Sequence, residues 1–159
     1  MSETIIKTKE FKKWTDGISA EYKHSQLKAL IKVNYEMLAF YYALGKEISN
    51  LSFKEFYGSK FYDNLSKELI KNNSCVLTLS PNNLRYMERF YLLYKNAIQI
   101  NPELGSKLYF IPWGHHRYII DKCKNVEEAL FYVDKVHENN WSSDELLNFL
   151  DANLYKREG

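Results

Sequence analysis

Apolar residues recur along this chain at spacings of three and four, which places them on one face of an α-helix. The longest such pattern runs over residues 16–50 and predicts one long helix with an apolar side. That side carries Leu27, Leu30, Asn34, Met37, Leu38, Tyr41, Leu44, Gly45 and Ile48. Gly45 would permit another helix to approach closely. A buried Asn34 needs a hydrogen-bonding partner, which we expect within the chain rather than on a second subunit.

Five further helices are expected downstream of this one. They cover 60–71, a stretch that begins at Ser80, a short stretch ending near Cys123, about 126–137, and a stretch from Ser142 to Arg157. The chain has 3 proline and 6 glycine residues, which are too few for the many turns that an all-β fold needs. We therefore predict an all-α domain of about six helices around one core over residues 16–159. A flexible basic arm over residues 1–15 would precede it.

Two of the helix starts carry explicit capping signals. Ser80 is placed to cap a helix whose first residue is Pro81, where a missing N–H costs nothing. Ser142 and Glu145 have the spacing of a capping box. Apolar residues on either side of each cap are placed for a hydrophobic staple.

Composition and charge restrict the class of protein. The 159 residues are 45% hydrophobic, which is typical of a globular domain with a real core. A net charge of +2 permits nucleic-acid binding but does not argue for it, because a strong electrostatic footprint is more basic. Cys75 and Cys123 form neither a metal-binding spacing nor a disulfide framework. We expect a reduced, cytoplasmic protein without a signal peptide or membrane span.

The helix that begins at Ser80 carries the main candidate for recognition chemistry. Its apolar face consists of Leu84, Met87, Phe90, Tyr91 and Tyr94. A narrow polar stripe opposite consists of Asn82, Arg85, Arg89 and Asn96. Arginine and asparagine side chains match the base edges of a major groove. The simpler interpretation is that a surface helix is polar outside, and the helix alone favours that interpretation.

The preceding predicted helix leaves Lys60, Lys67 and Lys71 on its outer side. Two helices joined by a connector have the outline of a helix-turn-helix unit. The connector over residues 72–79 is longer than the usual three or four residues of that motif, which counts against a strict match.

His115 and His116 are the candidates for catalysis. Adjacent helical positions point about 100° apart, so the two imidazoles cannot readily chelate one metal. We expect instead that Trp113 is buried and that a neighbouring histidine ties down a helix start. Glu10 and Lys12 have a spacing used by some metal-dependent nucleases, but they lie in the predicted arm and the match is attributed to chance. No catalytic residue, metal or cofactor is predicted, and an enzyme built around the histidines is the weakest alternative.

Four segments in order resemble the N-terminal domain of the YhcG-like family of bacterial proteins. They are Asn34 with 41–48 (YYALGKEI), 79–91 (LSPNNLRYMERFY), 111–116 (IPWGHH), and 140–142 (NWS) with 154–159 (LYKREG). The resemblance covers nearly the whole chain. It implies a helix-turn-helix-like, DNA-binding module that typically precedes a PD-(D/E)XK nuclease-like domain. That domain would begin about where this sequence ends, so no nuclease residue is carried over.

The expected function is a non-catalytic module that brings a PD-(D/E)XK nuclease-like domain or partner to double-stranded DNA. The expected contacts are Asn82, Arg85, Arg89, Lys60, Lys67 and Lys71. One departure matters: the family pattern is often basic at position 88, where this chain has Glu88, and a carboxylate there repels phosphate. The alternative is a protein–protein interaction or oligomerisation module, including a homodimer, of a DNA-processing or defence system.

Overall fold

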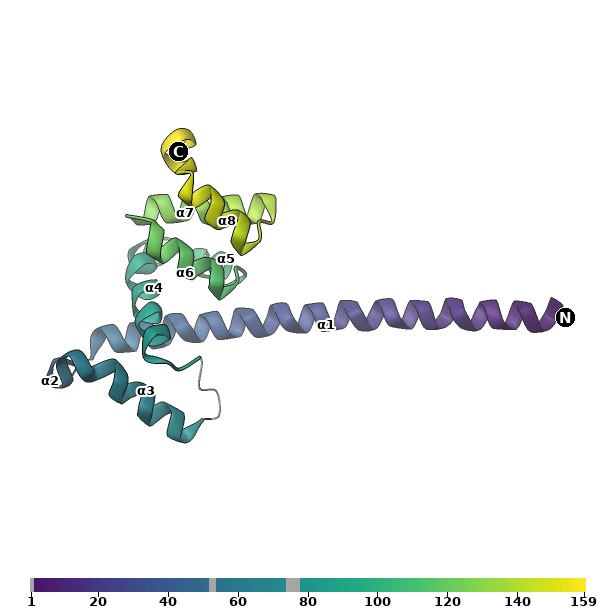
Figure 1. The fold of residues 1–159 in the computed structure, drawn as a ribbon, viewed down its shortest axis with the longest axis horizontal. Helices are drawn as coiled ribbons and strands as arrows, with labels where there is room; N and C mark the ends of the chain where they lie inside the picture. The colour runs from purple at the N-terminus through teal and green to yellow at the C-terminus, as the bar shows by residue number, and fades with distance from the viewer. Residues whose placement is uncertain (1, 52–53, 74–77) are drawn as a thin grey trace. The chain divides into compact units, whose positions relative to one another are not determined.

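A computed structural model describes residues 2–51, 54–73 and 78–159 of the chain (Figure 1). All regular structure within those ranges is helical, without a strand, which confirms the all-α prediction. The helices are α1 (Ser2–Asn50), α2 (Lys54–Tyr57), a 3-10 helix (Gly58–Lys60), α3 (Phe61–Asn72), α4 (Pro81–Ile100), α5 (Leu104–Tyr109), α6 (Trp113–Lys122), α7 (Val126–Asn139), α8 (Ser143–Asp151) and α9 (Leu154–Glu158).

The chain divides into two units, Met1–Asn34 and Tyr35–Gly159. In the first unit α1 begins at Ser2, so residues 2–15, expected as an irregular arm, are helical. The segment contains neither proline nor glycine, and local bonds support the helix. The Lys7 ammonium lies 3.7 Å from the Glu3 carboxylate one turn earlier, and the Thr8 hydroxyl donates to the Thr4 carbonyl oxygen at 2.8 Å.

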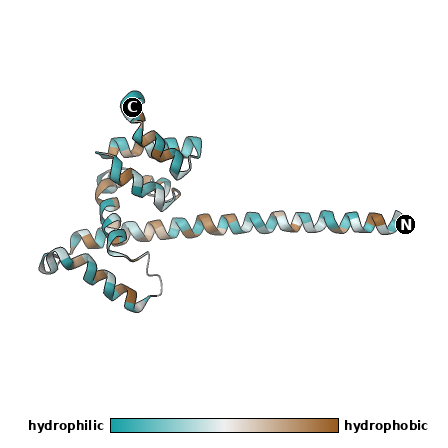
Figure 2. Cartoon of the chain, viewed as in Figure 1, coloured by the Kyte–Doolittle hydropathy of each residue, from teal (hydrophilic) through white to brown (hydrophobic). Residues whose placement is uncertain are grey.

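Several apolar residues of α1 that were expected in the core are exposed. Leu27 and Leu30 are 56% and 67% exposed, and Met37 is also on the surface, whereas Leu38 is fully buried. Figure 2 shows hydrophobic residues recurring along α1. Helical spacing predicts an apolar face but does not say whether another element covers it. Asn34, expected to be buried, is half-buried.

The second unit has two buried clusters rather than the single core predicted. One consists of Leu38, Tyr41, Ile48, Phe61, Leu84 and Met87, from α1, α3 and α4. The other consists of Phe90, Tyr94, Leu108, Ile111, Ile119, Ile120, Ala129, Tyr132, Val133, Val136, Leu146, Leu150 and Leu154, from α4 onward. Tyr109 and Trp113 are partly buried and pack against both clusters. The two clusters are therefore joined through a pair of aromatic rings, and α4 contributes to each.

The crossing of α1 and α4 depends on Gly45. A Cβ atom built at Gly45 would overlap the Met87 carbonyl oxygen and lie 3.1 Å from the Tyr91 Cβ. Any larger side chain would have to move the α4 backbone. The close approach predicted for Gly45 is confirmed.

Both capping signals are confirmed. The Ser80 hydroxyl accepts from the Asn83 N–H at 3.2 Å, and Pro81 is the first residue of α4. At α8, the Ser142 hydroxyl accepts from the Glu145 N–H, while the Glu145 carboxylate accepts from the Ser142 N–H, both at 3.2 Å.

Two boundaries differ from the prediction. The closing helix was expected to run without interruption to Arg157, but Asn153 has a φ of 55° and divides it into α8 and α9. Asparagine reaches this left-handed conformation more readily than most residues, and so ends a helix without glycine. Residues 104–109, expected within a loop, form α5.

Replacing Gly45 by alanine should lower the free energy of unfolding by about 1–3 kcal/mol, because the added methyl group overlaps the α4 backbone. Gly114 is the matched control: it lies in α6, and a Cβ there meets no other atom within 4 Å. Gly114→Ala should leave stability equal or slightly higher, since alanine favours the helix. Urea denaturation of both variants measures the difference. Equal midpoints for the two variants would contradict a tight crossing at Gly45.

Candidate nucleic-acid interface

Helix α4 presents the predicted polar stripe to solvent. Asn82, Arg85 and Arg89 are exposed, whereas Leu84 and Met87 on the opposite face are fully buried. The capped start at Ser80 and the two apolar clusters behind the helix fix this orientation.

Arg85 and Asn82 keep their polar groups available. The Arg85 guanidinium lies over the Tyr62 ring, 4.8 Å from its centroid. Across the described part of the chain, neither Arg85 nor Asn82 uses its side chain in a hydrogen bond or an ion pair. A cation–π contact holds an arginine in place without consuming its N–H donors. Both side chains are therefore exposed on α4, and their hydrogen-bonding groups are not used by the described part of the fold.

Arg89 is in a different situation, because the fold already uses its guanidinium. One of its terminal nitrogens lies 3.1 Å from the Asp121 carboxylate, and the other donates to the Ile120 carbonyl oxygen at 3.2 Å. These bonds tie α4 to the end of α6. The Asp121 carboxylate also partly neutralises the charge of Arg89.

Asp121 collects further polar groups around Arg89. The Tyr86 hydroxyl donates to the Asp121 carboxylate at 2.7 Å, and Arg117 lies over the Tyr86 ring, 4.7 Å from its centroid. This hydrogen bond, and then burial, raises the pKa of the Tyr86 hydroxyl. Sequence reasoning missed this cluster, because Arg89 and Asp121 are 32 positions apart and no local pattern connects them.

The three lysines of the predicted interface lie at or on α3. All three are exposed, on the side opposite the buried Phe61 and Ser66. Lys71 lies 3.1 Å from the Glu68 carboxylate in an exposed ion pair, which contributes little to stability. Lys60 and Lys67 form no ion pair with any described residue.

Glu88 was expected to oppose phosphate on the α4 face. Glu88 is half-buried in the structure, and its carboxylate accepts a hydrogen bond from the Tyr62 hydroxyl of α3. Burial, and then Glu88, raises the pKa of Tyr62 above its usual range. Tyr62 therefore contacts both Arg85 and Glu88, and it holds the two opposite charges side by side on the interface.

Asn83, which the sequence did not single out, anchors the start of α4. Its side-chain oxygen accepts from the Trp113 indole N–H at 2.7 Å, and its amide nitrogen donates to the Thr78 carbonyl oxygen at 2.7 Å. Trp113, expected to be buried, is half-buried and packs against both clusters. The connector before α4 is thus tied to α6, although residues 74–77 of that connector, including Cys75, lie outside the described residues.

His115 and His116 serve the fold. The His115 Nε2–H donates to the Trp141 carbonyl oxygen at 2.9 Å, and the His116 Nε2–H donates to the Leu108 carbonyl oxygen at 2.8 Å. Both residues are buried, His116 completely. Burial lowers the pKa of His116 from 6.5 to about 4, so it is neutral at physiological pH.

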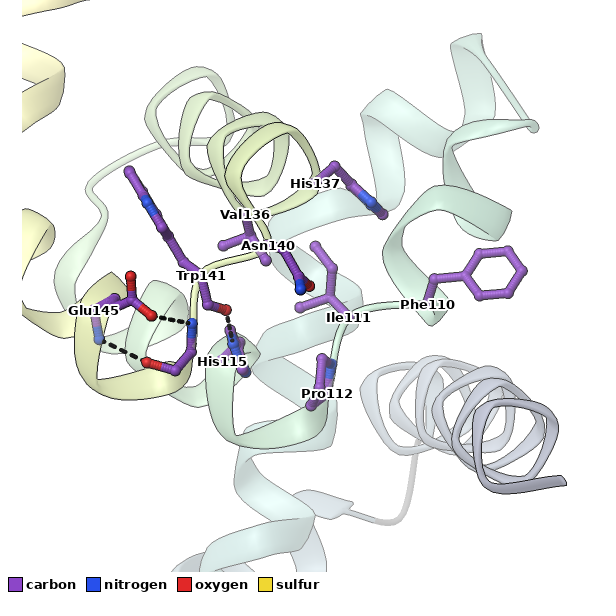
Figure 3. A pocket seen from close by; sticks show the side chains of 10 residues that line it. Phe110, Ile111, Pro112, His115, Val136, His137, Asn140, Trp141 and Glu145 are labelled. Atoms are coloured by element: carbon purple, nitrogen blue, oxygen red, sulfur yellow. Dashed lines mark hydrogen bonds between the residues drawn. The ribbon is translucent and has the colours of Figure 1, made fainter. Parts of the chain in front are cut away.

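A surface pocket of about 380 Å³ lies beside His115 (Figure 3). Figure 3 shows that two of its polar side chains are bonded within the lining: His115 to the Trp141 backbone, and Glu145 within the capping box. His116 does not line this pocket. Over the described residues, no three His, Cys, Asp or Glu side chains are grouped so as to hold a metal ion. Cys123 is half-buried, and burial raises the pKa of its thiol to about 12.

The described residues form an all-helical domain in which α4 exposes one polar face to solvent. Nowhere in the described ranges does a helix combine the length and apolarity needed to cross a membrane. The chain matches the DUF1016 N-terminal domain over residues 17–157 and belongs to that family, which confirms the resemblance seen in the sequence. Neither the search of curated proteins nor that of solved structures returns a significant match.

His116 should make stability depend on pH. Its pKa is lowered on folding, so the unfolded state binds more protons between pH 6.5 and about 4. Stability should therefore fall as the pH decreases through that range. Comparison of urea midpoints at pH 7.5 and 5.5 for the wild type and His116→Asn should show a smaller pH dependence in the variant. His24→Asn, at an exposed position, should retain the wild-type dependence.

Proposed function

We propose that residues 35–159 form a non-catalytic module that binds double-stranded DNA through α4 and α3. The module would bring a PD-(D/E)XK nuclease-like domain or partner to DNA. The observation that supports this most is the uncommitted state of Asn82 and Arg85 on one exposed face of a rigidly held helix. Forked donors of this kind match base edges, and helices that read DNA use their N-terminal residues for this purpose.

The proposed DNA contacts fall into two kinds, those that can reach base edges and those that reach only phosphates. Arg85 and Asn82 would reach base edges or phosphates directly, and Lys60 and Lys67 would add phosphate contacts from α3. Arg89 and Lys71 would contribute less, because each is engaged in an ion pair. In this proposal α3, its connector and α4 act as a helix-turn-helix-like unit.

Arg85→Ala should reduce DNA affinity by about 1–3 kcal/mol if Arg85 reads a base, and the loss should depend on the DNA sequence. If Arg85 contacts only phosphate, the loss of affinity should be similar for every duplex. The slope of log affinity against log salt concentration should then be smaller in magnitude by about one. Fluorescence anisotropy at several salt concentrations, starting low, measures both quantities. Glu88→Gln should strengthen binding, since it removes a negative charge and retains an acceptor for Tyr62.

The matched control is Lys156→Ala, which removes one exposed positive charge from α9. It should weaken binding much less than Arg85→Ala. Equal effects of the two substitutions, or no effect of Arg85→Ala at low salt, would rule out α4 as the DNA-reading helix.

A second candidate function is self-association through the first unit. Phe11, Trp14, Ile18 and Tyr22 follow one another at spacings of three and four, and all are exposed. Leu27 and Ile31, four residues apart, are exposed as well. Proteins that remain monomeric rarely expose this much apolar surface. The occupant that fits best is a second copy of the same helix, because apolar residues at spacings of three and four along an exposed helix favour helix-on-helix packing.

Leu27→Glu combined with Ile31→Glu should convert a dimer into a monomer, because each substitution places a charge in the apolar seam. Ser19→Glu introduces a charge at an exposed position about 80–100° around the helix from both Leu27 and Ile18, and it should leave the dimer intact. Light scattering coupled to size-exclusion chromatography measures the molar mass. A monomeric wild type at the highest soluble concentration would exclude self-association.

A further inference from the structure

A second polar surface lies beside the crossing of α1 and α4, and it shares Asn96 with the polar stripe of α4. A pocket of about 490 Å³ opens there. Its polar lining consists of Tyr42, Lys46, Tyr91, Lys95, Asn96 and Gln99. A volume of this size is ordinary for a small-molecule site.

The tight packing at Gly45 builds this pocket. Lys46 follows Gly45 directly, and Tyr42 is about one turn earlier on α1. On α4, Tyr91 and Lys95 are one and two turns after Met87, the residue that Gly45 contacts. The ring centroids of Tyr42 on α1 and Tyr91 on α4 are 5.3 Å apart, and both residues line the pocket.

The charge of the pocket is positive and uncompensated. Among the residues that the structure describes, no carboxylate lines it. Lys46 and Lys95 are exposed, and neither ammonium forms an ion pair or hydrogen bond with any part of the chain that the structure describes. Glu47 points about 100° away from Lys46 around α1, and the Glu88 carboxylate is bonded to Tyr62. Two lysines facing one site repel each other unless an anion lies between them.

We propose that this pocket binds a phosphate group of a nucleotide or of a nucleic-acid backbone. Lys46 and Lys95 neutralise the phosphate, and the amides of Asn96 and Gln99 donate to its oxygens. The Tyr42 and Tyr91 rings offer a surface for the attached sugar or base. Burial, and then the neighbouring Tyr91, raises the pKa of Tyr42, so its hydroxyl remains a donor at neutral pH.

Two sources could supply this phosphate, and α4 connects the pocket to one of them. Lys95 is ten residues after Arg85 on the same helix, about 15 Å along its axis. DNA bound along α4 would therefore reach the pocket with its backbone, and in that case the inference rests on the proposed function. A free nucleotide would require no DNA binding at all.

The experiment compares three probes: inorganic phosphate, adenosine monophosphate and a short DNA duplex. Each is titrated into the wild type, into Lys46→Gln/Lys95→Gln, and into Lys124→Gln/Lys156→Gln. The last variant is the control, because it loses the same charge from exposed lysines outside the pocket. Backbone amide NMR shifts report the location of binding, and thermal melting checks that each variant folds.

We expect shifts centred on Lys46, Lys95 and Asn96, with affinity lower by about tenfold or more in the pocket variant and nearly unchanged in the control. If the pocket variant loses affinity for adenosine monophosphate but not for the duplex, the phosphate belongs to a free nucleotide. If the pocket variant loses affinity only for the duplex, and its log affinity depends on log salt concentration with a slope smaller in magnitude by about two, the phosphate belongs to a nucleic-acid backbone. Equal effects of the pocket and control variants on all three probes would overturn the proposal. Arg85→Ala in the duplex titration tests the proposed function separately, because Arg85 does not line this pocket.

Discussion

The contact between Gly45 and the α4 backbone is the constraint on which the second unit depends. Because Gly45 has no side chain, α1 and α4 cross closely enough to seal Leu38, Leu84 and Met87 into one cluster. The same helix α4 then continues into the second cluster through Phe90 and Tyr94. A side chain at position 45 would separate the helices at the point where both clusters meet α4.

This crossing also decides which surfaces of α4 remain available. One side is buried along most of its length, so its polar side faces solvent and its start is held by Asn83 and Trp113. The two arginines of that side nevertheless differ, although they are one turn apart. Arg89 meets the Asp121 carboxylate, whereas Arg85 lies over the face of the Tyr62 ring and pairs with no carboxylate of the described residues. The chemistry of each arginine is therefore set by its neighbour on another helix rather than by its position on α4.

The elements that depend on local sequence were predictable. The capped starts at Ser80 and Ser142, the helix of α7 and the exposure of the α4 stripe all follow from residues a few positions apart. What depends on distant residues was not predictable. The Arg89–Asp121 bond, the Trp113–Asn83 bond and the Tyr42–Lys95 pocket each join segments about 30 to 50 positions apart. Leu27 and Leu30 were expected inside because spacing identifies an apolar face without identifying its cover.

The two proposed functions are compatible, and the modest charge of the chain gives them a common physical basis. A net charge of +2 and a few uncommitted basic side chains support only weak binding of one module to DNA. Two modules joined by a helical seam would bind as a pair, because the second contact becomes intramolecular and benefits from a high effective concentration. Paired reading of two half-sites is the usual arrangement of helix-turn-helix proteins. An exposed apolar helix and an uncommitted polar helix in one chain thus fit a protein that gains DNA affinity by association rather than by charge.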